Sequence, residues 1–582
     1  DMDRADTSDE VAESGPLRGR PWLASYAPGV EADLEVPAES LPEMLASSAV
    51  SHSSRVALDF FGAETTYTEL AVQVDRAAEA LRNLGVKTGD RVALVLPNCP
   101  QHVVAFYAAL RLGAIVVEHN PLYTAPELEH QLSDCGATVV VCWDKTAPVI
   151  DELRAKTAVR IILAVDLTNA VPWQMRLKLR LPVAKARAAR AAMTGPVPPG
   201  VLRWERVASS SGPLNAAHPL PRPEDVALLQ YTGGTTGTPK GAILTHRNLR
   251  ANAAQGRAWM PGLKDGEETV YAVLPLFHAY GLTLCLTYSM SVGATLVLLP
   301  RFDLDLMLEA VLRRPPTFLP AVPPIYERLA TAARERGVDL TSIRYAISGA
   351  MALPPAVVEM WESVSGGLLV EGYGMTETSP VALGNPAAPT RRPGTVGVPF
   401  PSTRIRIVDP DEPSHDLPIG VQGELLIAGP QVFAGYWNRP QETATALLPG
   451  GWVRTGDIAI ADTDGFIRIV DRIKELIITG GFNVYPSEIE DVLRQLPEIE
   501  DVAVVGVHTG DTGEEVVAVV VASPGTTVDP ERVRAFAREQ LTGYKVPRRV
   551  VVLDDLPRSQ IGKVLRRRVR ERIEATDAFD VD

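Results

Sequence analysis

Short apolar runs alternate with amphipathic stretches along the first two thirds of the chain. Residues 91–96 and 115–118 are almost continuously apolar, as expected of parallel strands that are buried on both faces. Between them, residues 101–112 carry apolar side chains at helical spacing. This alternation predicts an α/β fold with a largely parallel sheet. The same pattern predicts further strands at residues 138–142, 161–165, 270–274, 318–322, 343–348 and 368–371.

The first residues of the chain lack this pattern. Residues 1–40 contain Pro, Gly and acidic residues without periodicity, which predicts a poorly ordered lead-in. A first helix and its exit are expected at residues 41–57, and a second helix is expected to start at Thr68 as its cap and to run to Leu84. The uncharged residues 279–300 are diluted by Gly, Ser and Thr, which favours a buried helix, a break at Gly293 and a strand over a membrane helix.

The pattern changes near residue 403, where short alternating strands begin. They predict a β-rich subdomain at residues 403–470, within a large domain that spans residues 41–470. Residues 471–474 are interpreted as a hinge, and residues 475–582 as a small, mobile α+β domain. A chain of 582 residues also exceeds the roughly 250–300 residues at which single cores stop growing. At least two domains are therefore expected.

Charge and cysteine content narrow the class of protein. The formal net charge of −14 argues against general nucleic-acid binding by the whole surface. The four cysteines are scattered without a CxxC pair, which indicates a reducing compartment and no structural zinc. The first residues are acidic and polar, unlike a signal peptide, and a cytoplasmic location is expected.

Residues 172–200 contain Arg and Lys but no acidic residue, although the chain as a whole is acidic. No acid occurs between Asp166 and Glu205, whereas seven Arg and Lys residues do, interleaved with Trp173 and several leucines. One interpretation is a surface that contacts an anionic membrane peripherally, at its inner face. The other is a solvated helical insertion whose arginines provide solubility.

A glycine- and threonine-rich loop follows an apolar strand end at residues 229–241, which read LQYTGGTTGTPKG. We call these residues the phosphate loop. Its glycines allow backbone N–H groups to approach an anion closely, while its hydroxyls and one lysine add donors and charge. It differs from a Walker A loop because Pro239 precedes the lysine. The predicted nucleotide contacts in the loop are Thr232, Gly233, Gly234, Thr235, Thr236, Gly237 and Lys240.

Four more strings follow in order: EGYGMTET (371–378), GWVRTGD (451–457), DRIKELIITGGFNVYPSEIE (471–490) and PRSQIGKVLRRR (557–568). Together with the phosphate loop they resemble the signatures of the adenylate-forming (AMP-binding) superfamily. The chain is most similar in texture to acyl-CoA synthetases, in particular bacterial long-chain fatty acid–CoA ligases. Luciferases of this superfamily carry a lysine where this chain has Ile477, Ile478 and Thr479, so light emission is not expected.

The resemblance assigns roles that the residue chemistry supports. A carboxylate beside a triphosphate needs a cation between them, so Glu377 is the expected Mg²⁺ ligand. Asp457 can accept hydrogen bonds from both hydroxyls of a ribose, and Arg472 is matched to the same region. Lys563 would offset charge that develops at the α-phosphate. The resemblance implies an adenine pocket made by Gly349, Ala350, Gly372, Tyr373, Gly374, Met375 and Thr376.

Further roles follow only from the resemblance. His278 is expected to border the acyl group and to act in catalysis, together with an acyl pocket at Val322 and Val370. Lys474 is the expected pivot of the hinge, with Asp471 beside it. The pair Gly480 and Gly481 is expected to lie against the CoA arm.

The implied reaction uses ATP, Mg²⁺, a fatty acid and CoA. The acid is first converted to acyl-AMP with release of pyrophosphate, and CoA then displaces AMP. An aryl- or medium-chain acid–CoA ligase, and a fatty acyl-AMP ligase that feeds a carrier protein, remain alternatives. A non-enzymatic nucleotide-binding protein is a third. Either a monomer or a homodimer is expected.

Overall fold

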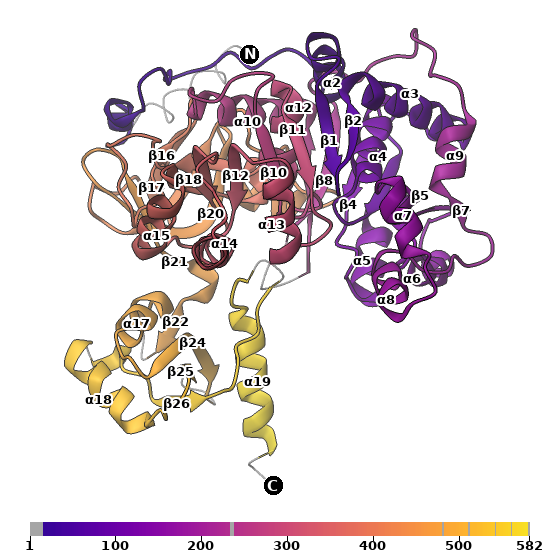
Figure 1. Cartoon of the computed structure of the whole chain (residues 1–582). Helices are drawn as coiled ribbons and strands as arrows, with labels where there is room; N and C mark the ends of the chain where they lie inside the picture. The colour runs from indigo at the N-terminus through magenta and orange to yellow at the C-terminus, as the bar shows by residue number, and fades with distance from the viewer. Residues whose placement is uncertain are drawn as a thin grey trace.

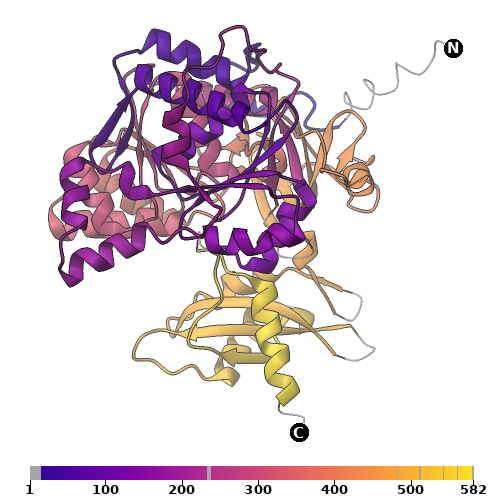
Figure 2. The ribbon, with the colours of Figure 1, turned by 90° about the vertical axis from the view of Figure 1, so that its right-hand side faces the viewer.

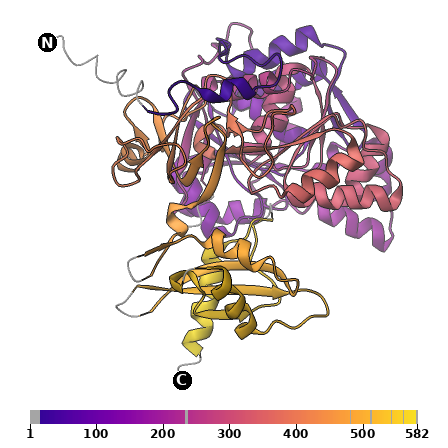
Figure 3. The same cartoon turned by 90° about the vertical axis from the view of Figure 1, so that its left-hand side faces the viewer.

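A computed structural model describes residues 15–232, 238–479, 482–509, 513–541, 543–559 and 562–579. The chain forms a large domain and a small domain that lies on one side of it (Figure 1). Views from the two sides show the same arrangement, with α19 (Arg566–Phe579) running away from the large domain toward the C-terminal end (Figures 2 and 3).

Strand β3 (Arg91–Val95) of the first sheet shows why the strand centres are apolar. Val92 and Leu94 of β3 face a core that is shared with the rest of the large domain. Ala93 and Val95 face a second core, which α5 (Ala125–Cys135) and α6 (Ala147–Glu152) help to close. Side chains alternate along a strand, so a strand buried on both sides has no polar position.

The strand order of this sheet is β7-β6-β5-β3-β4-β8-β9, and all pairs are parallel except β8–β9. Its strands and helices are β3 (Arg91–Val95), α4 (Pro100–Arg111), β4 (Ile115–Glu118), α5 (Ala125–Cys135), β5 (Val139–Trp143), α6 (Ala147–Glu152), β6 (Ile161–Val165), α7 (Trp173–Leu179), α8 (Ala184–Met193), β7 (Leu202–Arg203), α9 (Trp204–Ser210), β8 (Val226–Tyr231) and β9 (Gly241–Thr245).

The second sheet of the large domain has the order β16-β15-β14-β13-β12-β10-β11-β1-β2 and is parallel from β14 to β1. Its strands are β1 (Val56–Phe60), β2 (Ala63–Thr66), β10 (Thr269–Ala272), β11 (Thr295–Leu298), β12 (Phe318–Ala321), β13 (Tyr345–Ser348), β14 (Leu368–Gly374), β15 (Val381–Gly384) and β16 (Val398–Pro399). Helices α2 (Leu41–Ser51), α3 (Tyr67–Asn83), α10 (His246–Trp259), α13 (Leu304–Arg313), α14 (Pro323–Arg336) and α15 (Pro355–Ser365) accompany it.

The uncharged stretch at residues 279–300 stays inside the protein. It forms α11 (Ala279–Gly281), a π-helical turn η4 (Leu282–Thr287) and α12 (Tyr288–Val292), ends at Gly293 in a left-handed conformation, and continues as β11. The predicted buried helix, break and strand are therefore confirmed. None of the described helices has the length and apolarity that a bilayer crossing requires.

The C-terminal third contains the antiparallel and mixed sheets that the sequence predicts. One sheet pairs β17-β18-β20-β19, with β21 on β20, and the small domain pairs β24-β25-β26 next to the hairpin β22–β23. The elements are β17 (Arg404–Val408), β18 (Gly423–Ala428), α16 (Pro440–Ala446), β19 (Leu447–Leu448), β20 (Trp452–Ala461), β21 (Ile467–Arg472), η6 (Ile473–Glu475), β22 (Ile477–Thr479), β23 (Phe482–Val484), α17 (Pro486–Leu493), β24 (Ile499–His508), β25 (Glu514–Ala522), α18 (Pro530–Gln540) and β26 (Arg549–Val552).

Two local predictions are wrong. Residues 15–40 are packed rather than poorly ordered: Trp22 is 1% exposed, and the Tyr26 hydroxyl donates to the Pro399 carbonyl at 2.5 Å. The cap of α3 is Thr66 rather than Thr68, because the Thr66 hydroxyl accepts from the Glu69 N–H while the Glu69 carboxylate accepts from the Thr66 N–H. The Thr68 hydroxyl donates to the Ser53 carbonyl instead.

Candidate active site

The predicted site residues of the large domain follow the carboxyl ends of strands in both large sheets. Lys240 lies in the connection after β8, His278 follows β10, and Val322 follows β12. The connection after β13 contains Gly349 and Ala350, and β14 leads into Glu377. Ligands of open α/β sheets bind at these ends, so the topology gathers the candidates along one edge of each sheet.

Side-chain amides hold the connection that carries His278. The Asn98 amide donates to the carbonyls of Ala272 and Leu274, while its oxygen accepts the Leu276 N–H at 2.8 Å. Gln230, at the end of β8, donates to the Phe277 carbonyl at 2.7 Å. These contacts join the two sheets directly beneath His278. Sequence reasoning missed both amides because a lone Asn or Gln carries no pattern.

The phosphate loop is described only at its two ends. Gly233, Gly234, Thr235, Thr236 and Gly237 lie outside the described residues. At the base of the loop, the Thr232 N–H donates to the Lys240 carbonyl at 2.9 Å, and the Lys240 N–H donates to the Thr232 hydroxyl at 3.2 Å. Thr232 therefore closes the loop in addition to any contact with a ligand.

The ammonium group of Lys240 lies over the ring of Tyr436, 4.5 Å from its centroid. The Tyr436 hydroxyl in turn donates to Oε2 of Glu377 at 2.9 Å. The structure thus brings the predicted phosphate lysine and the predicted metal ligand to the same tyrosine. Sequence reasoning missed Tyr436, whose only signal is the short aromatic run around Gly435.

The Glu377 carboxylate fits a Mg²⁺ site. Its side chain is buried, and burial raises its pKa, while the hydrogen bond from Tyr436 and the charge of Lys240 act in the opposite direction. In the described part of the chain, no three His, Cys, Asp or Glu side chains cluster as a metal-binding group. A single carboxylate is nevertheless suited to Mg²⁺, which commonly completes its shell with waters and substrate phosphates.

Asp457 and Tyr373 meet at the boundary between β14 and β20. The Tyr373 hydroxyl donates to Asp457 Oδ2, and Arg472 Nε lies 3.8 Å from Asp457 Oδ1 across the β20–β21 pair. Burial raises the pKa of Asp457, whereas Arg472, Tyr373 and Lys563 favour its charged form. The predicted ribose and adenine residues are therefore neighbours, and a hydroxyl already fills one acceptor position of the carboxylate.

Lys563 reaches this cluster from the small domain. A Cβ on the neighbouring Gly562 would lie 3.6 Å from Pro324, at the start of α14. Burial and the charge of Arg472 lower the pKa of Lys563 to about 8, while Glu475 and Asp457 oppose the shift. The lysine therefore faces the residues that are expected to hold the nucleotide, with a pKa near neutral pH.

His278 lies near the same group of residues, because the charge of Lys563 acts on it. Surrounding protein atoms and the charge of Lys563 lower its pKa to about 4, although the residue keeps some exposure to solvent. Its Nδ1 accepts the Tyr280 N–H at 3.3 Å. The ring is consequently neutral at physiological pH, and its proton sits on Nε2, which can donate a hydrogen bond but cannot supply a positive charge.

Three glycines that are predicted to line the adenine pocket are tightly packed against neighbouring protein atoms. A Cβ on Gly374 would lie 1.9 Å from the Pro380 carbonyl oxygen, one on Gly372 would lie 2.9 Å from Ile347, and one on Gly349 would lie 3.1 Å from the Tyr280 ring. A Cβ at each of these glycines would therefore meet protein atoms, which is a packing reason for glycine there, and the adenine role stays a prediction. Ala350 is exposed and left-handed, with φ of +69°, while Met375 and Thr376 are half-buried in the turn before Glu377.

The remaining candidates are placed as follows. Val322 and Val370 are 2% and 3% exposed and lie in the core of the large domain. Asp471 accepts the N–H groups of Arg472 and Ser487 at 3.0 and 2.9 Å, so it joins the two sides of the hinge, and Lys474 is exposed in η6. Gly480 and Gly481 lie outside the described residues. Acyl, CoA and pivot roles stay predictions.

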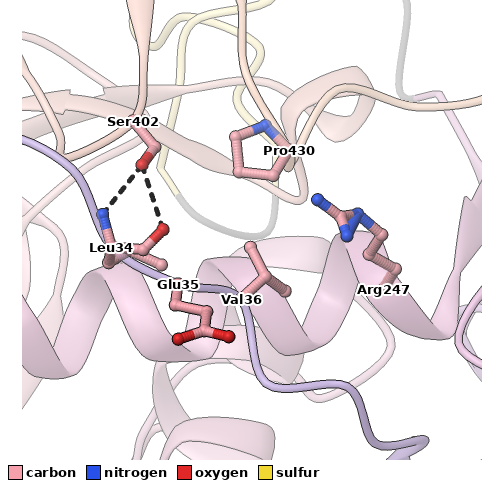
Figure 4. Close-up of a pocket in the computed structure, with 6 residues that line it drawn as sticks. All are labelled: Leu34, Glu35, Val36, Arg247, Ser402 and Pro430. Atoms are coloured by element: carbon pink, nitrogen blue, oxygen red, sulfur yellow. Dashed lines mark hydrogen bonds between the residues drawn. The ribbon is translucent and has the colours of Figure 1, made fainter.

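A surface pocket of about 540 Å³ lies elsewhere, between the N-terminal segment and α10. Figure 4 shows Leu34, Glu35, Val36, Arg247, Ser402 and Pro430 around it, with Ser402 bonded to the backbone of Leu34. None of the predicted site residues lines this pocket. It is therefore not the candidate active site.

Comparison with known proteins agrees with this geometry. The family model "AMP-binding enzyme" matches residues 45–437, and the model "AMP-binding enzyme C-terminal domain" matches residues 488–563. The chain belongs to the AMP-binding enzyme family. The two matches correspond to the large and the small domain, and the second ends at Lys563.

Relatives in this family match almost the whole chain. A long-chain-fatty-acid–CoA ligase of Bacillus subtilis is 38% identical over 95% of this chain and 98% of its own length. One from Escherichia coli is also 38% identical, over 94% of this chain and 98% of its own length. Among solved structures, ATP-bound MatB of Rhodopseudomonas palustris matches with a TM-score of 0.79 and 30% identity, over 92% of this chain and 99% of its own.

Proposed function

We propose that this protein is an ATP-dependent acid–CoA ligase that activates long-chain fatty acids through an acyl-AMP intermediate. In the first step, a carboxylate oxygen of the acid attacks the α-phosphorus of ATP and pyrophosphate leaves. In the second step, the CoA sulfur attacks the acyl carbonyl carbon, its proton is lost to solvent, and AMP leaves. The adenylate makes the second step feasible because AMP is a far better leaving group than hydroxide.

The meeting of Lys563 with Asp457 and His278 is the observation that carries this proposal. The carboxylate of the acid and the triphosphate of ATP repel one another, and the candidate site supplies cations from both domains: Lys240 from the large domain and Lys563 from the small one. Such charge compensation and positioning dominate phosphoryl-type transfer. Mg²⁺, held by Glu377, would add charge neutralisation at the phosphates when bound.

The other residues take supporting roles. Asp457 would exchange the Tyr373 hydroxyl for ribose hydroxyls, and Arg472 would keep it ionised. Neutral His278 would donate from Nε2 to the acid or the adenylate carbonyl. Closure of the small domain over the candidate site would exclude water, which would otherwise hydrolyse the acyl-AMP.

The long-chain substrate class rests on the relatives at 38% identity that are long-chain-fatty-acid–CoA ligases. An aryl acid is the second candidate, because a feruloyl-CoA synthase of Amycolatopsis is 36% identical over 88% of this chain.

The deciding experiment measures AMP formation from ATP with saturated acids of increasing chain length and with ferulate, each with and without CoA. A CoA-dependent rate that rises with chain length supports the proposal. Turnover of ferulate alone would shift the substrate class to aryl acids. Pyrophosphate release without CoA-dependent turnover would replace the ligase with an acyl-AMP ligase.

A peripheral membrane contact through residues 172–200 is the second part of the proposal. Trp173 and Leu177 of α7 are 68% and 56% exposed, and Leu181 and Val183, between α7 and α8, are 51% and 50% exposed. Exposed cations flank them on the two helices and in their connection: Lys178, Arg180, Lys185, Arg187 and Arg190. Apolar anchors with basic neighbours suit an anionic lipid surface, from which a long-chain acid would be collected.

Point variants test this contact better than a deletion would, because α8 is bonded to the sheet through the Trp143 Nε1–Met193 carbonyl contact at 2.9 Å. The triple variant Trp173→Ser/Leu177→Ser/Leu181→Ser should reduce co-sedimentation with phosphatidylglycerol vesicles. Leu312→Ser, at a side chain that is 74% exposed elsewhere, serves as the control. Equal vesicle binding by the two variants would favour the solvated-insertion interpretation.

A further inference from the structure

A short segment, residues 433–437, crosses between the phosphate loop and the turn that carries Glu377. The Phe433 N–H donates to the Glu377 carbonyl at 2.9 Å. Farther along, the N–H of Ala434 donates to Ile243 at 3.0 Å, and the N–H of Trp437 donates to Gly241 at 2.8 Å. The segment therefore pairs with β9, directly after Lys240, and reaches the backbone of Glu377 at its other end.

Tyr436 is held rigidly within this crossing segment. Its N–H donates to the Thr443 hydroxyl at 2.9 Å, and the residue is 7% exposed. The Phe433 ring packs edge-on against the Tyr436 ring, with 4.8 Å between the ring centroids. The preceding Gly435 has φ of +130°, and a Cβ there would lie 2.7 Å from Thr443. These contacts fix the ring before any ligand arrives.

The ring and the hydroxyl of Tyr436 contact two different charged groups. Lys240 lies over the ring face, and the hydroxyl donates to one oxygen of Glu377. Burial raises the pKa of Tyr436 far above its ordinary value, so the hydroxyl remains a donor. Within the described residues, no ion pair joins Lys240 to Glu377 directly, although their charges attract.

We infer that Tyr436 is a positioning residue that keeps Lys240 and Glu377 apart and oriented, so that the lysine stays available to a phosphate and the carboxylate to a divalent cation. The inference rests on the proposed function for the identity of these ligands. Without the ring, the two opposite charges would pair and satisfy each other. Without the hydroxyl, the carboxylate would lose the donor that sets its rotation.

Two variants separate these roles. Tyr436→Phe keeps the ring over Lys240 and removes the donor to Glu377, whereas Tyr436→Leu removes both. Tyr26→Phe is the matched control, because it deletes another phenol hydrogen bond, to the Pro399 carbonyl, outside the candidate site. Two equilibrium constants are measured without any acid substrate: ATP binding in EDTA by calorimetry, and Mn²⁺ binding to the ATP complex by electron paramagnetic resonance.

Loss of a residue that orients a metal ligand typically costs about 10- to 100-fold in metal affinity. Tyr436→Phe should weaken Mn²⁺ binding by that factor and leave ATP binding in EDTA within about twofold of wild type. Tyr436→Leu should also weaken ATP binding in EDTA, by about fivefold, the value of a typical cation–π contact. Tyr26→Phe should change neither constant.

Unchanged Mn²⁺ affinity in Tyr436→Phe would overturn the inference, as would identical ATP affinities in EDTA for the two Tyr436 variants. The proposed function fails differently. A wild-type protein that binds Mn²⁺ and ATP but forms no AMP with any acid would overturn the ligase assignment and leave the role of Tyr436 intact.

Discussion

Lys563 is the residue whose environment most directly bears on the proposed chemistry. It lies among groups of both signs: Arg472 and Arg566 disfavour its charge, while Glu475 and Asp457 favour it. Desolvation is the largest influence, and the resulting pKa of about 8 lies well below the ordinary value of 10.5. The protonated form is the useful one, because only a cation offsets charge at the α-phosphate.

The adenylation rate should therefore fall as pH rises through about 8, the pKa of Lys563 in the free enzyme. The decline should appear in kcat/KM for ATP, which reports ionisations of the free enzyme. In Lys563→Arg the cation persists at high pH, so the basic limb should vanish even if the rate is lower. An unchanged basic limb in that variant would assign the titration to another group.

Lys563→Ala should reduce acyl-AMP formation by about 10²- to 10³-fold, the usual cost of removing one charge-stabilising contact. Thioester formation from supplied acyl-AMP and CoA should stay near the wild-type rate. The control is Arg567→Ala. Arg567 belongs to the same basic run, is half-exposed and pairs with Glu571. Equal loss in both half-reactions would contradict the assignment of Lys563 to adenylation.

Single residues were predictable where they form part of a string with fixed spacing. Lys240, Glu377, Asp457 and Lys563 each lie in such a string. The fold brings the first two to Tyr436 and the last two near each other, while their roles stay predictions. Tyr436 and Gln230 were not predictable, since their role depends on which strands become neighbours.

At the scale of elements, continuous apolar runs were reliable guides. The strands at 115–118 and 161–165 have the predicted bounds. Helix α14 was missed because its first residues are Pro323 and Pro324, which suggest a loop although proline is well suited to the first turn of a helix. Helix α19 was also missed, because it begins within a run of basic residues.

Residues 15–40 were predicted to be poorly ordered because of their loop-like composition. The prediction was wrong because one large side chain of this segment is buried. Trp22 is 1% exposed, and its backbone and ring lie beside Gly465. Trp22→Ala should destabilise the large domain by about 3–5 kcal/mol, measured as a lower midpoint of urea unfolding. Trp173→Ala, at 68% exposure, should leave the midpoint nearly unchanged. Similar midpoints for both variants would mean that the lead-in adds nothing to stability.

At the scale of the whole molecule, the chain passes from the large domain to the small one through the 3₁₀ turn η6, which contains Lys474. Proline fixes φ near −65°, which a turn of this kind tolerates but a rotating pivot does not. Lys474→Pro should therefore retain acyl-AMP formation and slow the CoA step at least tenfold, as measured by single-turnover assays of each half-reaction. Lys474→Ala, which leaves φ free, should keep both steps, and parallel losses in the proline variant would argue against a pivot at this residue.

The hydrogen bond from Tyr373 to Asp457 bears on how the protein would discriminate between sugars. Under the proposed function, a ribose that enters would replace the phenol hydroxyl at the carboxylate, so the sugar would gain a hydrogen-bond partner only by displacing one. When a deoxyribose lacks the competing hydroxyl, the phenol can return and keep the carboxylate satisfied. An unpaired buried carboxylate is the main penalty that such a site imposes on a ligand that lacks a hydroxyl. Since Tyr373 can remove this penalty, 2′-deoxy-ATP should be a modestly poorer substrate than ATP and should still be used.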